Sequence, residues 1–216
     1  MPTRTQTLLE EKVNAFTHGL GVLFSFYCIY ILWQKVLPTG DDTMLMGVTI
    51  FSIGMVAVYT TSTIYHAIQH PPFKKIANIA DHISIFILIG GTYAPIILHY
   101  VPESTALVFM IIQWLIILAG IVFKIFYTGK YEWLSVTLYV ILGWMLLFVI
   151  KPILLTMPAN IFFWIITGGI CYTSGIVFYL LDHRKHAHNI WHCFVLAGTL
   201  FHFIAVYKSI DVEVLF

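Results

Sequence analysis

Long apolar segments separated by short polar breaks run through the whole chain. A helix that crosses a bilayer needs about 20 mostly apolar residues, and seven stretches meet this requirement. They cover residues 17–36, 43–68, 79–100, 104–126, 133–150, 159–181 and 189–207. Proline, glycine or charged residues mark the breaks, one of which falls at Lys151 and Pro152. The pattern predicts an all-α fold: a single domain, residues 1–216, formed by an integral membrane bundle of seven transmembrane helices.

The composition supports a membrane protein and excludes several other classes. Hydrophobic residues make up 60% of the chain and charged residues only 10%, whereas a soluble domain carries about 25% charged residues. A net charge of +1 favours neither a nucleic acid nor an acidic partner. The three cysteines lie within apolar stretches, so we expect them to pack rather than to form disulfides.

The distribution of lysine and arginine predicts the orientation in the membrane. Positive residues are enriched in cytoplasmic connections, and eight lie at the end of the bundle that carries the N-terminus: Arg4, Lys12, Lys74, Lys75, Lys124, Lys130, Arg184 and Lys185. Three lie at the other end: Lys35, Lys151 and Lys208. The N-terminus is therefore expected in the cytoplasm and the C-terminus outside, in a protein of the plasma membrane. Lys124 is expected to extend from its helix end to the interface.

Two histidines at the start of the last helix have the spacing of a metal site. His188 and His192 are four residues apart, which places them on one helical face about 6 Å apart along the axis. Two imidazoles so arranged can bind one tetrahedral metal. A polar helix end that faces the cytosol would have the same pattern, and the spacing alone leaves both interpretations open.

Three more polar residues are expected at the same membrane depth. His66 lies near the end of the second helix, and three imidazoles are a common ligand set for catalytic zinc; a lone histidine there would more often be a packing residue. Asp81 is expected to open the third helix, where it could cap the helix or orient and deprotonate a metal-bound water. Ser62 could stabilise an oxyanion or serve as a small packing residue.

Other polar positions are expected to contribute less. Glu11, Asn14 and His18 share one helical face, which suggests a short helix leading into the first span. His202 lies about 15 Å deeper in the bundle than His192, too far to bind the same ion. Small residues such as Gly168, Gly169 and Gly175 leave open whether they serve internal packing or a homo-oligomer.

The polar motifs resemble those of the progestin and adipoQ receptor superfamily. Ser62-x-x-x-His66, Asp81 and His188-x-x-x-His192 are similar to its S-x-x-x-H, D and H-x-x-x-H motifs. Within that superfamily the chain looks most like the bacterial hemolysin III branch. The supporting strings are EEKVNAFTHG at 10–19, YHA at 65–67, GTYAP at 91–95 and HNIWH at 188–192.

The resemblance implies a metal centre and an activity. It implies zinc bound by His66, His188 and His192 near the cytoplasmic face, with Asp81 reaching the ion through water. It also implies hydrolysis of lipid amides such as ceramides, a role in membrane lipid homeostasis, and membrane lipids as partners. Two other functions stay open: a membrane-perturbing cytolysin with structural zinc, and a sensor of membrane state. Other late first-row metal ions would also suit a histidine-rich site.

Overall fold

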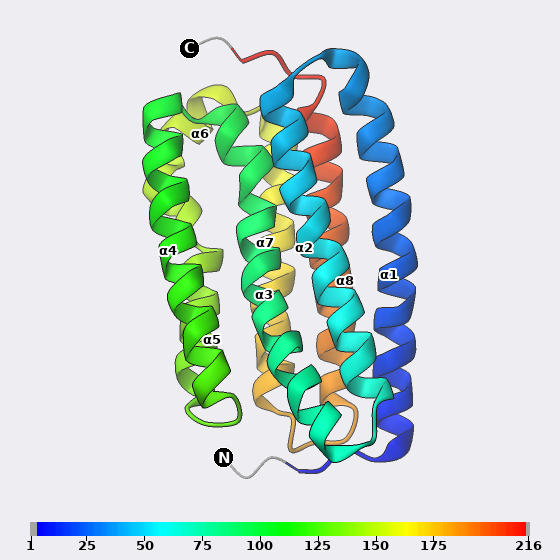
Figure 1. The fold of residues 1–216 in the computed structure, drawn as a ribbon. Coiled ribbons are helices and arrows are strands. Elements are labelled where there is room, and N and C mark those ends of the chain that lie inside the picture. Colours follow the sequence, from blue (N-terminus) through cyan, green and yellow to red (C-terminus); the bar gives the residue numbers. More distant parts are fainter. Residues whose placement is uncertain (1–3, 215–216) are drawn as a thin grey trace.

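The computed structural model describes residues 4–214 as a bundle of long helices, with the two termini at opposite ends (Figure 1). The α-helices are α1 (Leu8–Val36), α2 (Asp42–Ala67), α3 (Pro71–Tyr100), α4 (Glu103–Tyr127), α5 (Glu132–Gly143), α6 (Ile150–Thr156), α7 (Ala159–Leu180) and α8 (Ala187–Ser209). Two short 3₁₀ helices are η1 (Leu37–Thr39) and η2 (Met145–Val149). Within the described residues, seven segments are long and apolar enough to cross a membrane, and the fifth joins α5, η2 and α6. The predicted all-α, seven-span fold is confirmed.

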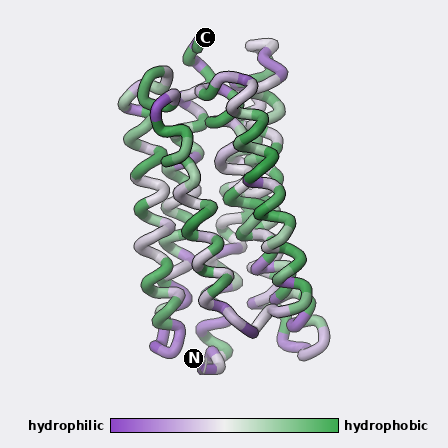
Figure 2. The backbone as a smooth tube through the Cα atoms, turned by 90° about the vertical axis from the view of Figure 1, so that its left-hand side faces the viewer, coloured by the Kyte–Doolittle hydropathy of each residue, from purple (hydrophilic) through white to green (hydrophobic). Residues whose placement is uncertain are grey.

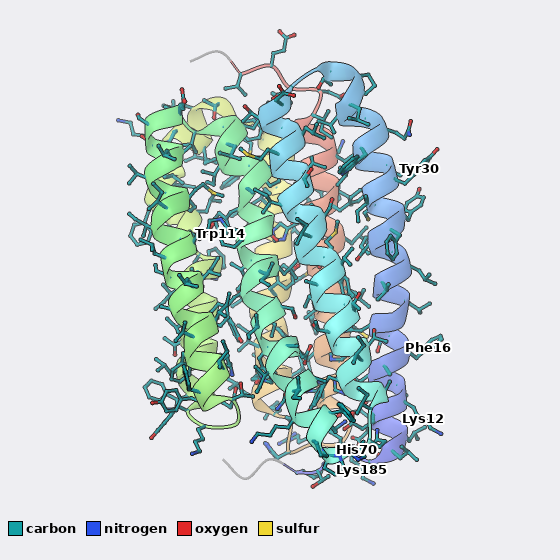
Figure 3. All side chains as sticks on the ribbon, in the orientation of Figure 1. Lys12, Phe16, Tyr30, His70, Trp114 and Lys185 are labelled. Carbon is teal, nitrogen blue, oxygen red and sulfur yellow. The ribbon has the colours of Figure 1, made fainter. Side chains whose placement is uncertain are left out.

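The outside of the bundle is apolar where a membrane would surround it. Hydrophobic residues prevail along the helices, and hydrophilic residues gather in the connections at the two ends (Figure 2). Phe16 and Tyr30 project from α1 away from the bundle (Figure 3), and their exposed fractions are 67% and 62%. Exposed apolar side chains on seven spans identify a multi-pass membrane protein. Which end faces the cytoplasm stays a prediction from the distribution of charge.

The first and third spans begin earlier than predicted. α1 starts at Leu8 because Thr7 and Glu10 form a capping box, in which each side chain accepts a hydrogen bond from the other residue's backbone N–H. The polar face with Glu11 therefore belongs to α1 itself, and the separate short helix predicted there is wrong. α3 starts at Pro71, a residue type favoured in the first helical turn. Asp81 thus lies well inside α3, and its predicted position at the opening of the helix is wrong.

The fifth span differs from its prediction at its C-terminal end. The predicted break at Lys151 and Pro152 is wrong, because both residues lie in the first turn of α6, where a proline is tolerated. The connection to α7 lies instead at Met157 and Pro158. The interruption within this span occurs earlier, where α5 ends at Gly143 and η2 follows.

Glycines bring α2 and α3 into backbone contact. A Cβ added at Gly47 would lie 2.5 Å from the Cα of Pro95, and one added at Gly91 would lie 2.8 Å from the Ile50 carbonyl oxygen. Such distances leave no room for a side chain, so small residues are required for this close approach. The contact sets the position of His66, at the end of α2, relative to α3.

This packing predicts a selective effect of Gly47→Ala. The added methyl group meets backbone atoms, so we expect a loss of about 1–3 kcal/mol in unfolding free energy and a lower thermal unfolding midpoint in detergent. Gly169→Ala is the matched control, because a Cβ there meets nothing within 4 Å, and alanine favours a helix over glycine. Equal midpoints for the two variants would contradict the close-contact account.

Candidate metal centre

Three histidines from two helices converge at the end of the bundle near the N-terminus. His66 lies in the last turn of α2, and His188 and His192 lie at the start of α8. One potential ligand atom from each lies within 4.8 Å of the other two. The ring centroids are 5.2 Å apart for His66 and His188, 5.0 Å for His66 and His192, and 4.8 Å for His188 and His192. The structure thus brings together the three residues selected from the sequence.

The unpaired nitrogens of this cluster fit a metal ion. His66 Nε2, His188 Nδ1 and His192 Nδ1 are buried, and none forms a hydrogen bond among residues 4–214; His188 Nδ1 lies 3.5 Å from Asp182 Oδ1. Buried polar atoms are almost always paired, so three orphans at one point require an explanation. One ligand atom from each histidine lies within 4.8 Å of the other two, so binding one ion through metal–nitrogen bonds of about 2.0–2.1 Å requires the rings to move slightly closer together. The three histidines could therefore hold a metal ion, and imidazole ligands suit zinc as well as copper, iron and nickel.

α1 surrounds the cluster with polar side chains. Glu11 Oε2 lies 2.7 Å from His66 Nδ1. The Asn14 side-chain oxygen accepts a hydrogen bond of 2.5 Å from the side-chain amide of Asn189 on α8. The imidazole of His18 stacks on that of His192, with centroids 3.6 Å apart.

The contacts of this part of α1 with the histidines were not predicted from the sequence. Glu11, Asn14 and His18 were placed on one face and assigned no part in the metal centre. The available signal was their spacing at i, i+3 and i+7, which continues as one polar stripe into an apolar helix. If the first span had been predicted to begin at the Thr7–Glu10 capping box, Glu11, Asn14 and His18 would have been placed on that span, inside the bundle.

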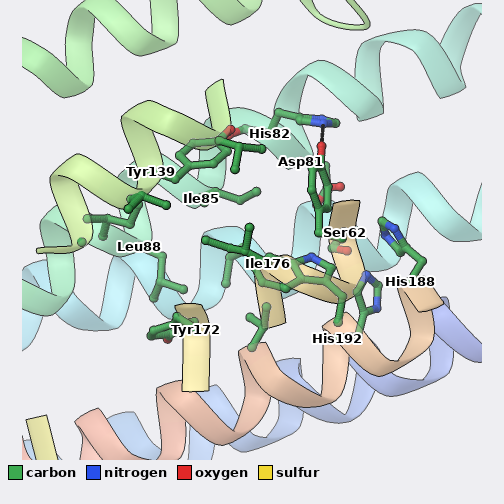
Figure 4. Close-up of a pocket in the computed structure, with 18 of the residues that line it drawn as sticks. Ser62, Asp81, His82, Ile85, Leu88, Tyr139, Tyr172, Ile176, His188 and His192 are labelled. Carbon is green, nitrogen blue, oxygen red and sulfur yellow. Dashed lines mark hydrogen bonds between the residues drawn. The ribbon is translucent and has the colours of Figure 1, made fainter. Parts of the chain in front are cut away.

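Asp81 and Ser62 line the same pocket as His188 and His192 (Figure 4). Asp81 comes from α3 and is not one of the three residues whose ligand atoms gather. Ser62 comes from α2, one turn before His66; its Oγ is buried and has no hydrogen-bond partner within the described part of the chain. Their catalytic roles stay predictions.

The pocket continues from the histidines into the bundle. Its volume is about 840 Å³, within the range of sites that bind small molecules. Apolar residues such as Leu88, Ile165 and Ile176 also line it; Ile176 lies beside His192 and Leu88 lies farther from the histidines (Figure 4). His202 also lines the pocket, and its Nε2 lies 3.1 Å from the Ile165 carbonyl oxygen. His202 is therefore separate from the three clustered imidazoles.

Comparison with known proteins agrees with the resemblance drawn from the Ser62–His66, Asp81 and His188–His192 motifs. The family model described as "Haemolysin-III related" matches residues 6–203. The chain belongs to this family. It is 36% identical to the "Hemolysin-3 homolog" of Bacillus subtilis (strain 168), over 93% of this chain and 94% of the relative. It is 34% identical to "Hemolysin-3" of Bacillus cereus, over 95% of this chain and 94% of the relative.

A more distant human relative extends the comparison. The human "Monocyte to macrophage differentiation factor" is 24% identical over 94% of this chain and 85% of the relative. The resemblance inferred from the motifs is thereby confirmed at the level of the haemolysin-III-related family.

A second polar cluster in this haemolysin-III-related protein corrects the expectation for Lys124. Its side chain is fully buried and does not extend to the interface, because Nζ pairs with Glu132 Oε2 at 2.8 Å across the α4–α5 connection. The Tyr179 hydroxyl donates to the same oxygen at 3.3 Å, and His82 Nε2 lies 3.7 Å from it. The cluster fixes the connection between α4 and α5 beside the pocket.

The geometry predicts that a metal ion stabilises the fold through the three histidines. Zinc added to metal-stripped protein at about 100 times its dissociation constant should stabilise it by about 2.7 kcal/mol, seen as a higher thermal unfolding midpoint. His192→Ala should abolish this shift, because one of three ligands is lost. His183→Ala is the control, since His183 is exposed on the α7–α8 connection. An undiminished shift in His192→Ala would contradict the assignment.

Proposed function

We propose that the protein is a zinc-dependent hydrolase of the plasma membrane that cleaves membrane lipid amides, as ceramidases do. One observation carries this proposal: three imidazoles, two buried and one half-buried, converge beside a largely apolar cavity that two of them, His188 and His192, line. A metal-binding group beside an apolar cavity suits a substrate with a polar scissile bond and a hydrocarbon chain. Membrane lipids have this form and reach a bundle directly from the bilayer.

The residues of the site would divide the work of amide hydrolysis. Zinc held by His66, His188 and His192 would polarise the substrate carbonyl and lower the pKa of water towards about 7. Asp81 would accept the proton of the attacking water and deliver it to the leaving amine, so that water and amide yield a carboxylic acid and an amine. The Ser62 hydroxyl would donate a hydrogen bond to the oxygen that develops negative charge.

The cavity would bind the acyl chain and exclude water from the reaction. Leu88, Ile165 and Ile176, which line the cavity, would contact the acyl chain. The carbonyl would then lie at the end near His192. With the orientation predicted from Lys and Arg, this end lies on the cytoplasmic side of the bundle, so lipids of the cytoplasmic leaflet are the proposed substrates.

Asp81→Asn tests this division of roles. The amide cannot take up a proton, so we expect the variant to keep its metal and to lose about 10²–10⁴-fold in turnover. The measurement is release of fluorescent fatty acid from a labelled ceramide by protein in detergent, with metal content determined on the same samples. Glu103→Gln is the matched control, because it neutralises an exposed carboxylate at the other end of the bundle. Full turnover in Asp81→Asn would refute the proposed role of Asp81.

A membrane-perturbing function is the second candidate, because one relative is named "Hemolysin-3" and another "Hemolysin-3 homolog". Release of a trapped dye from liposomes distinguishes the two functions. The hydrolase proposal predicts that purified protein without metal releases no dye and cleaves no lipid. Dye release that persists after the metal is removed, without cleavage in the metal-loaded protein, would favour the membrane-perturbing function.

A further inference from the structure

We propose that Glu11 is a positioning residue of the metal centre, which fixes the orientation and protonation pattern of His66 and is itself held by Lys74. Three helices meet in this arrangement: α1 supplies Glu11, α2 supplies His66 and α3 supplies Lys74. The inference rests on the metal site proposed above and not on any reaction at that site.

Glu11 is placed where it can act on only one ring nitrogen of His66. Its side chain is buried, with an exposed fraction of 8% for the residue, and Oε2 lies 2.7 Å from Nδ1. An ionised carboxylate only accepts hydrogen bonds, so Nδ1 must carry the proton. The lone pair is then on Nε2, which is buried without a partner among the described residues. The contact therefore selects the tautomer of His66 that presents Nε2 to a metal ion.

Lys74 holds the other oxygen of the same carboxylate. Its Nζ lies 2.9 Å from Glu11 Oε1. The same ammonium group donates to the carbonyl oxygens of Tyr65 at 3.0 Å and Ile68 at 3.2 Å, at the C-terminal end of α2. A cation at this end of a helix is favoured by the helix dipole. Lys74 thus fixes the carboxylate against the turn that carries His66.

The same face of α1 contacts the other ligand-bearing helix. Asn14 pairs with Asn189, the residue after His188, and His18 stacks on His192. The three residues of the stripe therefore contact His66, the neighbour of His188, and His192, respectively. Glu11 differs from the other two because it hydrogen-bonds a ligand ring directly. Carboxylates bound to the second nitrogen of a metal-ligating histidine fix its tautomer and orientation, and losing them typically costs 10–100-fold in metal affinity.

A purely structural ion pair between α1 and α3 is the competing explanation. In that case Glu11 would stabilise the bundle equally with and without metal, and removing Lys74 would have the same effect as removing Glu11. The positioning role predicts that metal affinity falls when the hydrogen bond between Glu11 and His66 is removed. It predicts a smaller effect when only the ion pair between Glu11 and Lys74 is removed.

Zinc affinity of the full-length, metal-stripped protein in detergent separates these explanations. Titration against a competing chelator should show Glu11→Ala about 10–100-fold weaker than the wild type. Glu11→Gln should recover part of the affinity, because its amide oxygen can still accept from Nδ1–H. Lys74→Met should lose less affinity than Glu11→Ala, because the carboxylate loses one support but can still accept from His66 Nδ1–H. Thermal unfolding of the same metal-stripped samples reports the structural contribution separately.

A spectroscopic readout tests the tautomer directly. In metal-free protein labelled with ¹⁵N-histidine, the ¹⁵N signals of His66 are assigned as those that disappear in His66→Ala. The wild type should show His66 protonated at Nδ1. Glu11→Ala should show His66 as a mixture of the two tautomers. Unchanged zinc affinity in Glu11→Ala, or equal losses in Glu11→Ala and Lys74→Met, would overturn the positioning role. A wild type that binds no zinc would overturn the metal centre itself, which is a different result.

Discussion

Polar groups inside a membrane-spanning bundle have no water to bind, so each of them needs a partner within the protein or an ion. This constraint explains the arrangement at the end of the bundle near the N-terminus. Glu11, Asn14 and His18 bring polar groups into a helix whose outer side is apolar, and all three are buried. Glu11 and Asn14 find polar partners on α2, α3 and α8, whereas His18 forms no hydrogen bond among the described residues and stacks on His192. What is left without a partner within residues 4–214 includes one nitrogen on each of His66, His188 and His192.

The fold supports this cluster through contacts between helices far apart in sequence. Backbone contact at Gly47 and Gly91 fixes α2 against α3, and thereby fixes His66 against the helix that carries Asp81. Glu10 joins α1 to the start of α8, where its Oε1 accepts from the His186 backbone N–H at 2.9 Å. The cavity lies between these helices and α5 and α7. Its apolar walls and polar end support the proposal that the site binds a lipid.

Hydropathy and motif spacing predicted most of the fold and the three histidines. Seven spans follow from segment length, and the i, i+4 spacing of His188 and His192 with the equal depth of His66 located the cluster. The start of α1 was missed because residues 8–16 are too polar for a hydropathy window, whereas the capping box at Thr7 begins a helix regardless of hydropathy. The burial of Lys124 was missed because it depends on Glu132 folding back across a connection. Neither Glu11 nor Lys124 reveals its partner in the sequence, because each partner is set by packing between helices.

The proposed function depends on a metal ion bound by the three clustered histidines. The most direct test is the metal content of the detergent-purified protein, measured by elemental mass spectrometry beside a His188→Ala/His192→Ala double variant. The account predicts about one zinc ion per chain in the wild type and none in the variant, with both proteins folded. Metal-free, well-folded wild type, or equal zinc in the two proteins, would contradict it.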